Sequence, residues 1–167
     1  ILYIMENINN LFELIKQHKF NEFIKLLKND NFIDVNIRDD QNNYLLSYAI
    51  LFNQISIVEL LIEKGSRIDV TDNEDKSILF IPIKYNYIDV IKLILKNNIN
   101  NIGISVLDIK DRNYNIPIHY AIIYKNIEAL KLMLEHGSNL NITDKFGNNS
   151  FHLAVYSRNF DVCKYVL

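Results

Sequence analysis

Aspartates recur at a nearly constant interval along this chain of 167 residues. They are Asp39, Asp72, Asp111 and Asp144, and the first and last intervals are both 33 residues long while the middle one is 39. A fixed period of about this size indicates a structural unit that is repeated and stacked. Each unit in such a stack contacts only its neighbours, so the chain has no single deep core in which an active site would form. The period therefore favours binding of a partner over catalysis.

The segment after each aspartate reads as a turn, a short helix, a second turn and a longer helix. The longer helices are broadly apolar, and their apolar stretches are 57–62, 90–95 and 129–134. A face of that width needs neighbours on both sides, which a single unit does not provide. These helices are predicted to end at Gly65, Asn98 and Gly137, because Gly and Asn tolerate the positive φ that ends many helices.

The third segment carries the most informative motif. Residues 117–121 read Pro-Ile-His-Tyr-Ala, and residues 137–141, after a leucine-rich helix, read Gly-Ser-Asn-Leu-Asn. This pattern closely resembles the ankyrin repeat, which runs Asp-x-x-Gly-x-Thr-Pro-Leu-His-x-Ala, a second helix rich in Leu, and Gly-Ala-Asp-x-Asn. The resemblance covers nearly all of the chain after residue 38. It implies an all-α solenoid of stacked helix-turn-helix units with projecting β-turn or hairpin loops.

The predicted domain organisation follows the aspartates. Residues 1–38 contain a possible helix pair at 11–18 and 20–28 but lack the opening turn signature, so we interpret them as a divergent N-terminal capping repeat. The repeats that follow are predicted at 39–71, 72–110, 111–143 and, truncated, at 144–167. The sequence stops inside the second helix of the last segment, and we therefore expect it to be a piece of a longer array.

Two positions depart from the family pattern in ways that affect the backbone. In the turn after each aspartate, Asn42, Asp75 and Gly147 suit a left-handed conformation whereas Tyr114 does not, so we expect the third turn to differ. In the second repeat Pro82 replaces a small inward alanine. A proline inside a helix removes an amide donor and clashes with the preceding turn, which predicts a kinked or shortened helix.

The helix starts vary as well. Ser77 and Asn149 can cap the helices that follow them, and Pro117 suits a first helical position. Tyr44 and Ile116 offer no capping oxygen suited to the helix amides. Some first helices are therefore weakly specified by their own sequence.

Residues 97–109 contain the six residues that lengthen the middle interval. A loop reshaped for a partner would explain them, and so would neutral drift of length in a connection that tolerates it. We favour drift, and keep the loop as a candidate for binding.

Composition excludes several classes of partner. A net charge of −2, with no local segregation of charge, gives no general attraction for nucleic acid or acidic lipid. No apolar stretch is long enough to span a bilayer, and no signal peptide is recognisable.

The single cysteine excludes an intrachain disulfide and fits a reducing, intracellular compartment. Heavy use of Ile, Asn and Lys is typical of a low-GC genome, such as that of a giant DNA virus or certain protozoa, which predicts the host cytoplasm if the chain is viral.

Residues that invite a catalytic or metal interpretation have simpler roles. His119 and His152 occupy the same place in adjacent repeats, yet neighbouring helix axes lie about 8 to 10 Å apart, too far for the two rings to share an ion without distortion. The resemblance implies instead that this histidine bonds to nearby backbone and turn groups. His18 and His136 are interpreted as helix-surface residues, and Cys163 as a small buried hydrophobe rather than a reactive thiol. We predict no catalytic, cofactor or metal residue.

The resemblance also implies where a partner binds, because ankyrin stacks use their turn tips and the concave face of their first helices. The tip residues are Asn73, Glu74, Arg112, Asn113, Lys145 and Phe146. The residues at the ends of the first helices are Leu51, Phe52, Lys84, Tyr85, Ile123, Tyr124 and Tyr156. Aromatic side chains dominate binding hot spots, so Phe52, Tyr85 and Tyr124 are predicted to form the centre, although tyrosine at such positions also packs between repeats.

The implied function is a non-enzymatic scaffold for protein–protein interaction. We expect a monomer that binds a protein partner and uses no cofactor, metal, nucleic acid, membrane or small-molecule substrate. A second interpretation is the recruitment region of a larger enzyme or ubiquitin-ligase adaptor whose active part lies outside this chain. The identity of the partner does not follow from the fold.

Overall fold

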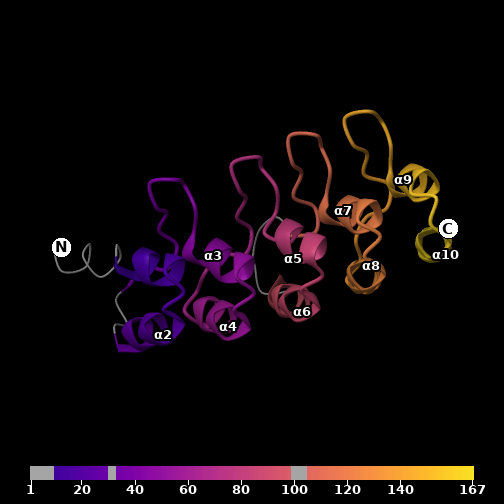
Figure 1. Cartoon of the computed structure of the whole chain (residues 1–167). Helices are drawn as coiled ribbons and strands as arrows, with labels where there is room; N and C mark the ends of the chain where they lie inside the picture. Colours follow the sequence, from indigo (N-terminus) through magenta and orange to yellow (C-terminus); the bar gives the residue numbers. More distant parts are fainter. Residues whose placement is uncertain (1–9, 30–32, 99–104) are drawn as a thin grey trace. The chain divides into compact units, whose positions relative to one another are not determined.

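The computed structural model describes residues 10–29, 33–98 and 105–167. Over these residues the regular structure is helical, and the helices occur in pairs separated by projecting loops (Figure 1). Two isolated antiparallel bridges, Arg38 with Tyr44 and Thr71 with Ser77, close the bases of two loops. The predicted all-α repeat fold is confirmed. The chain divides into two compact units, residues 1–67 and 68–167.

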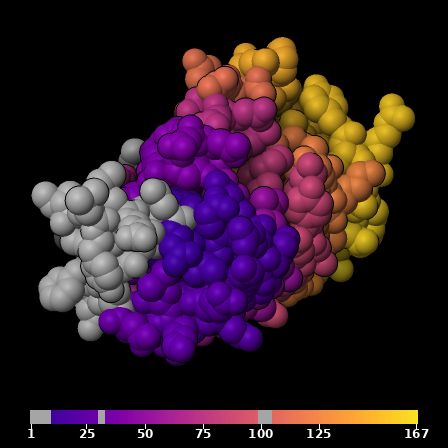
Figure 2. All heavy atoms as spheres, turned by 60° about the vertical axis from the view of Figure 1, so that its left-hand side comes forward, coloured from indigo at the N-terminus to yellow at the C-terminus, as the bar shows by residue number. Residues whose placement is uncertain are grey.

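The first unit begins with a helix over residues 10–16, followed by α2 (Phe20–Asn29), α3 (Leu45–Leu51) and α4 (Ile55–Glu63). The first two helices lie where the sequence predicted a helix pair, and their role as a capping repeat stays a prediction. Leu11, Ile15, Phe23 and Leu27 are fully buried, and the described residues of this unit form the indigo and purple part of the surface in Figure 2. His18 is not on a helix surface as predicted, because it lies in the turn between the two helices with a φ of 59°.

The second unit contains three helix pairs. They are α5 (Phe80–Tyr85) with α6 (Ile88–Asn97), α7 (Pro117–Ile123) with α8 (Ile127–Glu135), and α9 (Ser150–Tyr156) with α10 (Phe160–Val166). Within this unit α7 contacts both α5 and α9, while α8 contacts both α6 and α10. The first helices of the pairs thus form one row and the second helices another (Figure 1). Apolar side chains such as Ile94, Ile118 and Met133 are buried between the rows.

The aspartates build the turns in the same way each time. One carboxylate oxygen of each accepts the backbone amides two and four residues further on, at 2.8 to 3.0 Å. This arrangement confirms the prediction that the aspartates mark turns. Tyr114 adopts a φ of 62°, like Asn42 and Asp75 at the equivalent positions. The prediction that its turn differs is wrong, because the amides bound by Asp111 hold this turn in the same conformation.

Helix starts follow the predicted chemistry with one change. Asn149 caps α9 by accepting the amide of His152, Pro117 is the first residue of α7, and neither Tyr44 nor Ile116 makes a side-chain cap. Ser77 does not cap α5, whose N-cap is Leu79. Its hydroxyl instead accepts the amide of Leu79 at 3.3 Å, in the turn that precedes the helix.

The shortening predicted at Pro82 is confirmed. Helix α5 has six residues and begins at Phe80, which places Pro82 in its first turn. Amides in the first turn of a helix have no intrahelical acceptor, so the missing donor of proline costs nothing there.

Two of the three predicted helix ends have positive φ, and one does not. Gly65 and Gly137 have φ values of 88° and 80°. Asn98 follows the last residue of α6 as predicted, but its φ is −65°, so the expected positive φ is wrong there. Its side chain instead accepts the amide of Val106 at 3.0 Å and donates to the hydroxyl of Ser105 at 3.1 Å, which holds the two ends of the long connection together. Residues 99–104 of the predicted loop 97–109 lie outside the described residues.

Candidate protein-binding surface

Two of the four aspartates also bind a tyrosine that lies nine residues further along the chain. The hydroxyl of Tyr48 donates to Oδ2 of Asp39 at 2.8 Å, and the hydroxyl of Tyr120 donates to Oδ2 of Asp111. The tyrosines belong to α3 and α7, so each bond ties a first helix to the loop that precedes it. The sequence analysis missed this link, although the same spacing of nine residues occurs twice.

Both tyrosines hold their protons firmly. Burial raises the pKa of Tyr120, and the hydrogen bond to Asp111 raises it further. Burial also raises the pKa of Tyr48, with a second contribution from Asp39. The hydroxyls therefore remain donors at neutral pH, and the ties between helix and loop persist there.

In the first unit Lys16 completes the cluster around Asp39. Its ammonium lies 2.8 Å from Oδ2 of Asp39 and 5.3 Å from the centre of the Tyr48 ring. Burial alone would raise the pKa of Asp39, but hydrogen bonds from Lys16, the Asn43 amide and Tyr48 lower it to about 2. The carboxylate is thus ionised throughout the physiological range and joins the first helix of the unit to its loop.

Phe52 continues this cluster and is only half-exposed. Its ring stacks on Tyr48 with centroids 6.2 Å apart and lies 4.4 Å from the ring of His18. A third ring, Phe20, lies 6.4 Å away. The side chain proposed as part of a binding centre therefore also joins the two helix pairs of the first unit.

In the second unit the equivalent cluster leaves more aromatic surface open. Tyr124 stacks on Tyr120 at 6.2 Å, and the ring of Phe80 lies between α5 and α7 at 4.8 Å from Tyr120 and 6.1 Å from Tyr124. Tyr124 remains 40% exposed, and Tyr85, which stacks on Tyr87, is 51% exposed. Each of these rings is packed on one side and open on the other.

The remaining predicted helix-end residues are open to solvent. Leu51 of the first unit is exposed, as are Ile123 and Tyr156 of the second. The ammonium of Lys84 lies 5.3 Å from the centre of the Tyr85 ring and 5.9 Å from that of Phe80. In the second unit the ends of the first helices thus combine tyrosines with a cation.

The predicted tip residues mainly contact residues of neighbouring turns. Arg112 binds the carboxylate of Asp75 at 3.3 Å and the carbonyl of Asn73. The backbone amide of Lys145 donates to the carbonyl of Asn113 at 2.9 Å, and its ammonium donates to Oδ1 of Asn113 at 2.6 Å. These bonds link neighbouring loops of the second unit, which project from the same side in Figure 1. Phe146 is 76% exposed, and the ammonium of Lys145 lies 5.0 Å from the centre of its ring.

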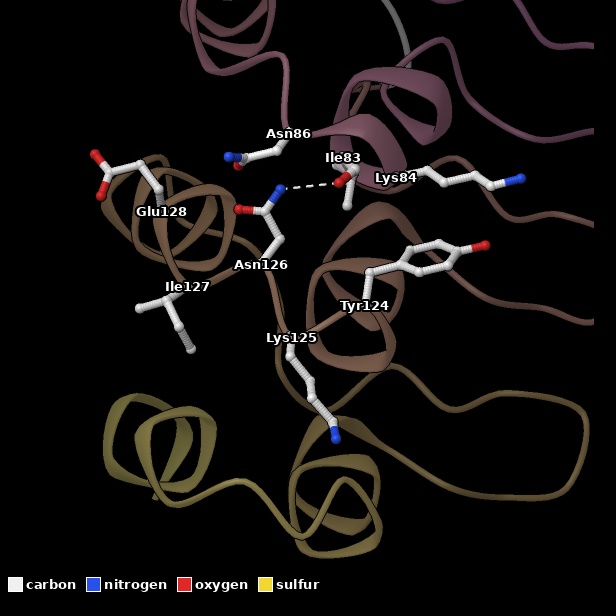
Figure 3. A pocket seen from close by; sticks show the side chains of 8 residues that line it. All are labelled: Ile83, Lys84, Asn86, Tyr124, Lys125, Asn126, Ile127 and Glu128. Atoms are coloured by element: carbon white, nitrogen blue, oxygen red, sulfur yellow. Dashed lines mark hydrogen bonds between the residues drawn. The ribbon is translucent and has the colours of Figure 1, made fainter.

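A hollow of about 320 Å³ lies at the helix ends between the first two pairs of the second unit (Figure 3). Asn126 forms its floor by donating to the carbonyl of Ile83 at 2.8 Å while its oxygen caps α8. The side chains of Lys84 and Tyr124 extend from the hollow in the same direction, and Glu128 points to the opposite side. Lys125 also lines this hollow.

The histidines have structural partners. The buried ring of His119 donates from Nε2 to the carbonyl of Ile142 at 3.1 Å, and burial lowers its pKa. His152 contacts Asn149 at the start of α9, and Nδ1 of His136 donates to the carbonyl of Leu132 at 2.8 Å. The backbone and turn roles implied by the resemblance are therefore present. Among the described residues no three His, Cys, Asp or Glu side chains are grouped to hold a metal ion.

Cys163 is half-buried rather than fully buried as predicted. Its thiol donates to the carbonyl of Ala154 at 3.3 Å, which joins α10 to α9. The buried apolar contacts of α10 come from Val162 and Val166 instead. In the part of the chain that the structure describes, every helix is too short or too polar to cross a membrane.

Comparison with known proteins places this arrangement in a family. Models of ankyrin repeats match residues 11–106 and 118–167. An ankyrin repeat protein of Acanthamoeba polyphaga mimivirus is 36% identical over 97% of the chain, and one of fowlpox virus is 26% identical over 100%. The NF-kappa-B p105 subunit of Gallus gallus is 37% identical over 34% of the chain. The chain spans 21% of the mimivirus protein, 31% of the fowlpox protein and 5% of the p105 subunit.

Proposed function

Because the chain belongs to the ankyrin repeat family, whose members serve as protein-interaction modules, we propose that it binds a protein partner without catalysing a reaction. The binding surface that we propose is formed by the ends of the first helices, with Tyr85 and Tyr124 at its centre. The turn tips contribute Phe146 and otherwise brace one another.

The proposal rests on the packing and the exposure of the two tyrosines. Tyr124 is held by Tyr120 and Phe80, and Tyr85 by Tyr87, yet about half of each side chain is open to solvent. A ring held on one side loses little rotational freedom when a partner covers the other side. Exposed aromatic side chains with few torsions to freeze are the type that dominates binding energy.

The two viral relatives support a setting inside an infected host cell, where the partner would be a host protein. A second candidate function follows from the share of those relatives that the chain covers, which is less than a third of either. The chain would then recruit a substrate for an enzyme or ubiquitin-ligase adaptor encoded elsewhere in the same protein. Both candidates require the same binding surface.

The test begins with affinity capture of a partner from the native cell and measurement of its Kd for the chain. We expect the double variant Tyr85→Ser/Tyr124→Ser to bind the captured partner at least about tenfold more weakly, as a change of about 1.4 kcal/mol would produce. Tyr165→Ser, which removes an exposed tyrosine from a second helix, serves as the matched control. Unchanged affinity of the double variant, with an unchanged thermal midpoint, would refute this surface.

A further inference from the structure

The first helices of the second unit carry charges of one sign. The first helices and the turns after them, residues 77–87, 116–126 and 149–159, contain no Asp or Glu. Their charged side chains of fixed sign are Lys84, Lys125 and Arg158, one in each repeat. The second helices and their ends carry both signs, since Asp89, Glu128, Glu135 and Asp161 are accompanied by Lys92, Lys96, Lys131 and Lys164. A row of cations therefore runs along the ends of the first helices.

These three cations have no carboxylate partner among the described residues. Other cations of the chain do, since Lys76 pairs with Glu74 and Arg112 pairs with Asp75. The ammonium of Lys84 lies near the rings of Phe80 and Tyr85. The row thus presents positive charge that the rest of the described chain does not neutralise.

Two of these cations lie where the backbone is left-handed. Lys125 and Arg158 have φ values of 55° and 49°, and the equivalent residues of the two preceding repeats, Asn53 and Asn86, have φ values of 53° and 60°. Asparagine tolerates this left-handed conformation better than a long side chain does. The backbone conformation alone therefore does not favour lysine or arginine at these positions, and residues in sparsely populated conformations often belong to binding sites.

Exposed tyrosines accompany each cation. Tyr85 follows Lys84, Tyr124 precedes Lys125, and Tyr156 lies two residues before Arg158. Lys84, Tyr124 and Lys125 line the same hollow of about 320 Å³ (Figure 3). Because α7 contacts both α5 and α9, the three pairs of cation and tyrosine follow one another from repeat to repeat.

We infer that this row binds an extended acidic segment of a partner protein, with carboxylates opposite the cations and apolar side chains against the tyrosines. The inference rests on the proposed function and specifies the chemistry of the partner. Neighbouring packed helices lie about 8 to 10 Å apart, and an extended chain advances about 3.3 Å per residue. An acidic residue at every third position therefore matches the spacing of equivalent positions in neighbouring repeats, such as Lys125 and Arg158.

A protein segment fits the row better than a nucleic acid does. The second unit carries equal numbers of Lys plus Arg and Asp plus Glu, 11 of each. A phosphate backbone carries negative charge at every step and would also meet the carboxylates of the turns and second helices. An acidic segment with spaced charges places carboxylates only where the cations lie.

The test uses the 167-residue chain and a fluorescent synthetic peptide that carries glutamate at every third position with leucine and serine between. A peptide with glutamine in place of glutamate, and a single-stranded oligo-uridine RNA of similar length, are the comparison probes. We expect the glutamate peptide to bind best, and its affinity to fall as salt is raised, because exposed charge pairs are screened. The Lys125→Asn/Arg158→Asn double variant should bind it about tenfold more weakly.

This double variant is well suited to the purpose because asparagine is the residue that two repeats of the chain already use at that position. Its thermal midpoint should therefore equal or exceed that of the wild type. The control Lys92→Gln/Lys164→Gln removes the same charge from exposed positions on second helices and should leave binding unchanged.

The inference would be overturned if the glutamate and glutamine peptides bound equally well or if neither bound. Preferential binding of the RNA would overturn it too. An equal loss of affinity in both double variants would do the same, since net charge alone would then explain it. The proposed function has its own test, because a captured partner sensitive to Tyr85→Ser/Tyr124→Ser would uphold the surface even if the acidic peptide failed.

Discussion

The hydroxyl of Tyr48 donates a hydrogen bond of 2.8 Å to Asp39, nine residues earlier in the chain. The same link joins Tyr120 to Asp111 in the third repeat. The second and fourth repeats have Ile81 and Leu153 at the equivalent position and lack it. In two of the four repeats the aspartate is therefore a joint between loop and first helix as well as a turn former, and this joint fixes the aromatic side chain one helical turn further on.

Removing the joint should weaken the fold. Tyr48→Phe and Tyr120→Phe each delete one hydrogen bond to a carboxylate, and we expect each to lower the free energy of unfolding by about 1 to 2 kcal/mol. Urea unfolding followed by circular dichroism measures this. Tyr124→Phe is the control, because its hydroxyl is exposed, and its effect should stay within about 0.5 kcal/mol. Equal effects of all three substitutions would contradict the role given to the joint.

The low pKa of Asp39 predicts a loss of stability in acid. Its folded-state pKa of about 2 lies below the ordinary value of 3.8, so the carboxylate contributes stability that is fully present above about pH 5 and is lost as the pH falls through the folded-state pKa. The contribution is on the order of 2 kcal/mol. Urea unfolding of wild type and Asp39→Asn at a series of pH values should show a stability difference that shrinks by this amount between about pH 5 and pH 2. A difference that does not change with pH would contradict the assignment.

Tyr114 should be a position at which glycine stabilises the chain. The tyrosine has a φ of 62° and is exposed, so its side chain buries little surface in return for a left-handed backbone. We expect Tyr114→Gly to raise the free energy of unfolding by roughly 1 kcal/mol. Tyr114→Val, which is β-branched, should lower it. A glycine variant less stable than the wild type would show that the ring makes contacts that matter more than the backbone.

His119 should remain neutral in mildly acidic solution. Burial lowers its pKa from the ordinary value of 6.5, and the proton is held on Nε2 by the carbonyl of Ile142. Its contribution to stability is present above pH 6.5 and is lost as the pH falls toward the folded-state pKa. A titration of the ring by NMR should give a midpoint below that ordinary value and a proton on Nε2 in the neutral form. A midpoint above it would contradict the burial that the structure gives this ring.

The features that were predictable from sequence are those determined by a few adjacent residues. The turn formed by each aspartate, the positive φ of Gly65 and the cap provided by Asn149 all depend on local backbone chemistry. Pro82 belongs to the same group, since the constraint it places on a helix acts within one turn.

The incorrect and missed features depend on side chains that meet across longer intervals. Asn98 ends α6 as its residue type predicts, but without the positive φ, and its side chain binds the amide of Val106, eight residues away. Tyr114 was judged by its residue type, whereas the carboxylate of Asp111 determines the turn. The cations at Lys125 and Arg158 became informative only when the structure showed the backbone conformation that they share with Asn53 and Asn86.

The central claim is that the chain recognises its partner with the ends of the first helices of the second unit. The most direct test is to add the glutamate peptide to the isotopically labelled chain and follow the backbone amide signals by NMR. We predict that the largest shifts fall on residues 84–86, 123–126 and 156–158. Shifts concentrated instead on the second helices, or confined to the turn tips at residues 73–75, 112–114 and 145–147, would contradict it.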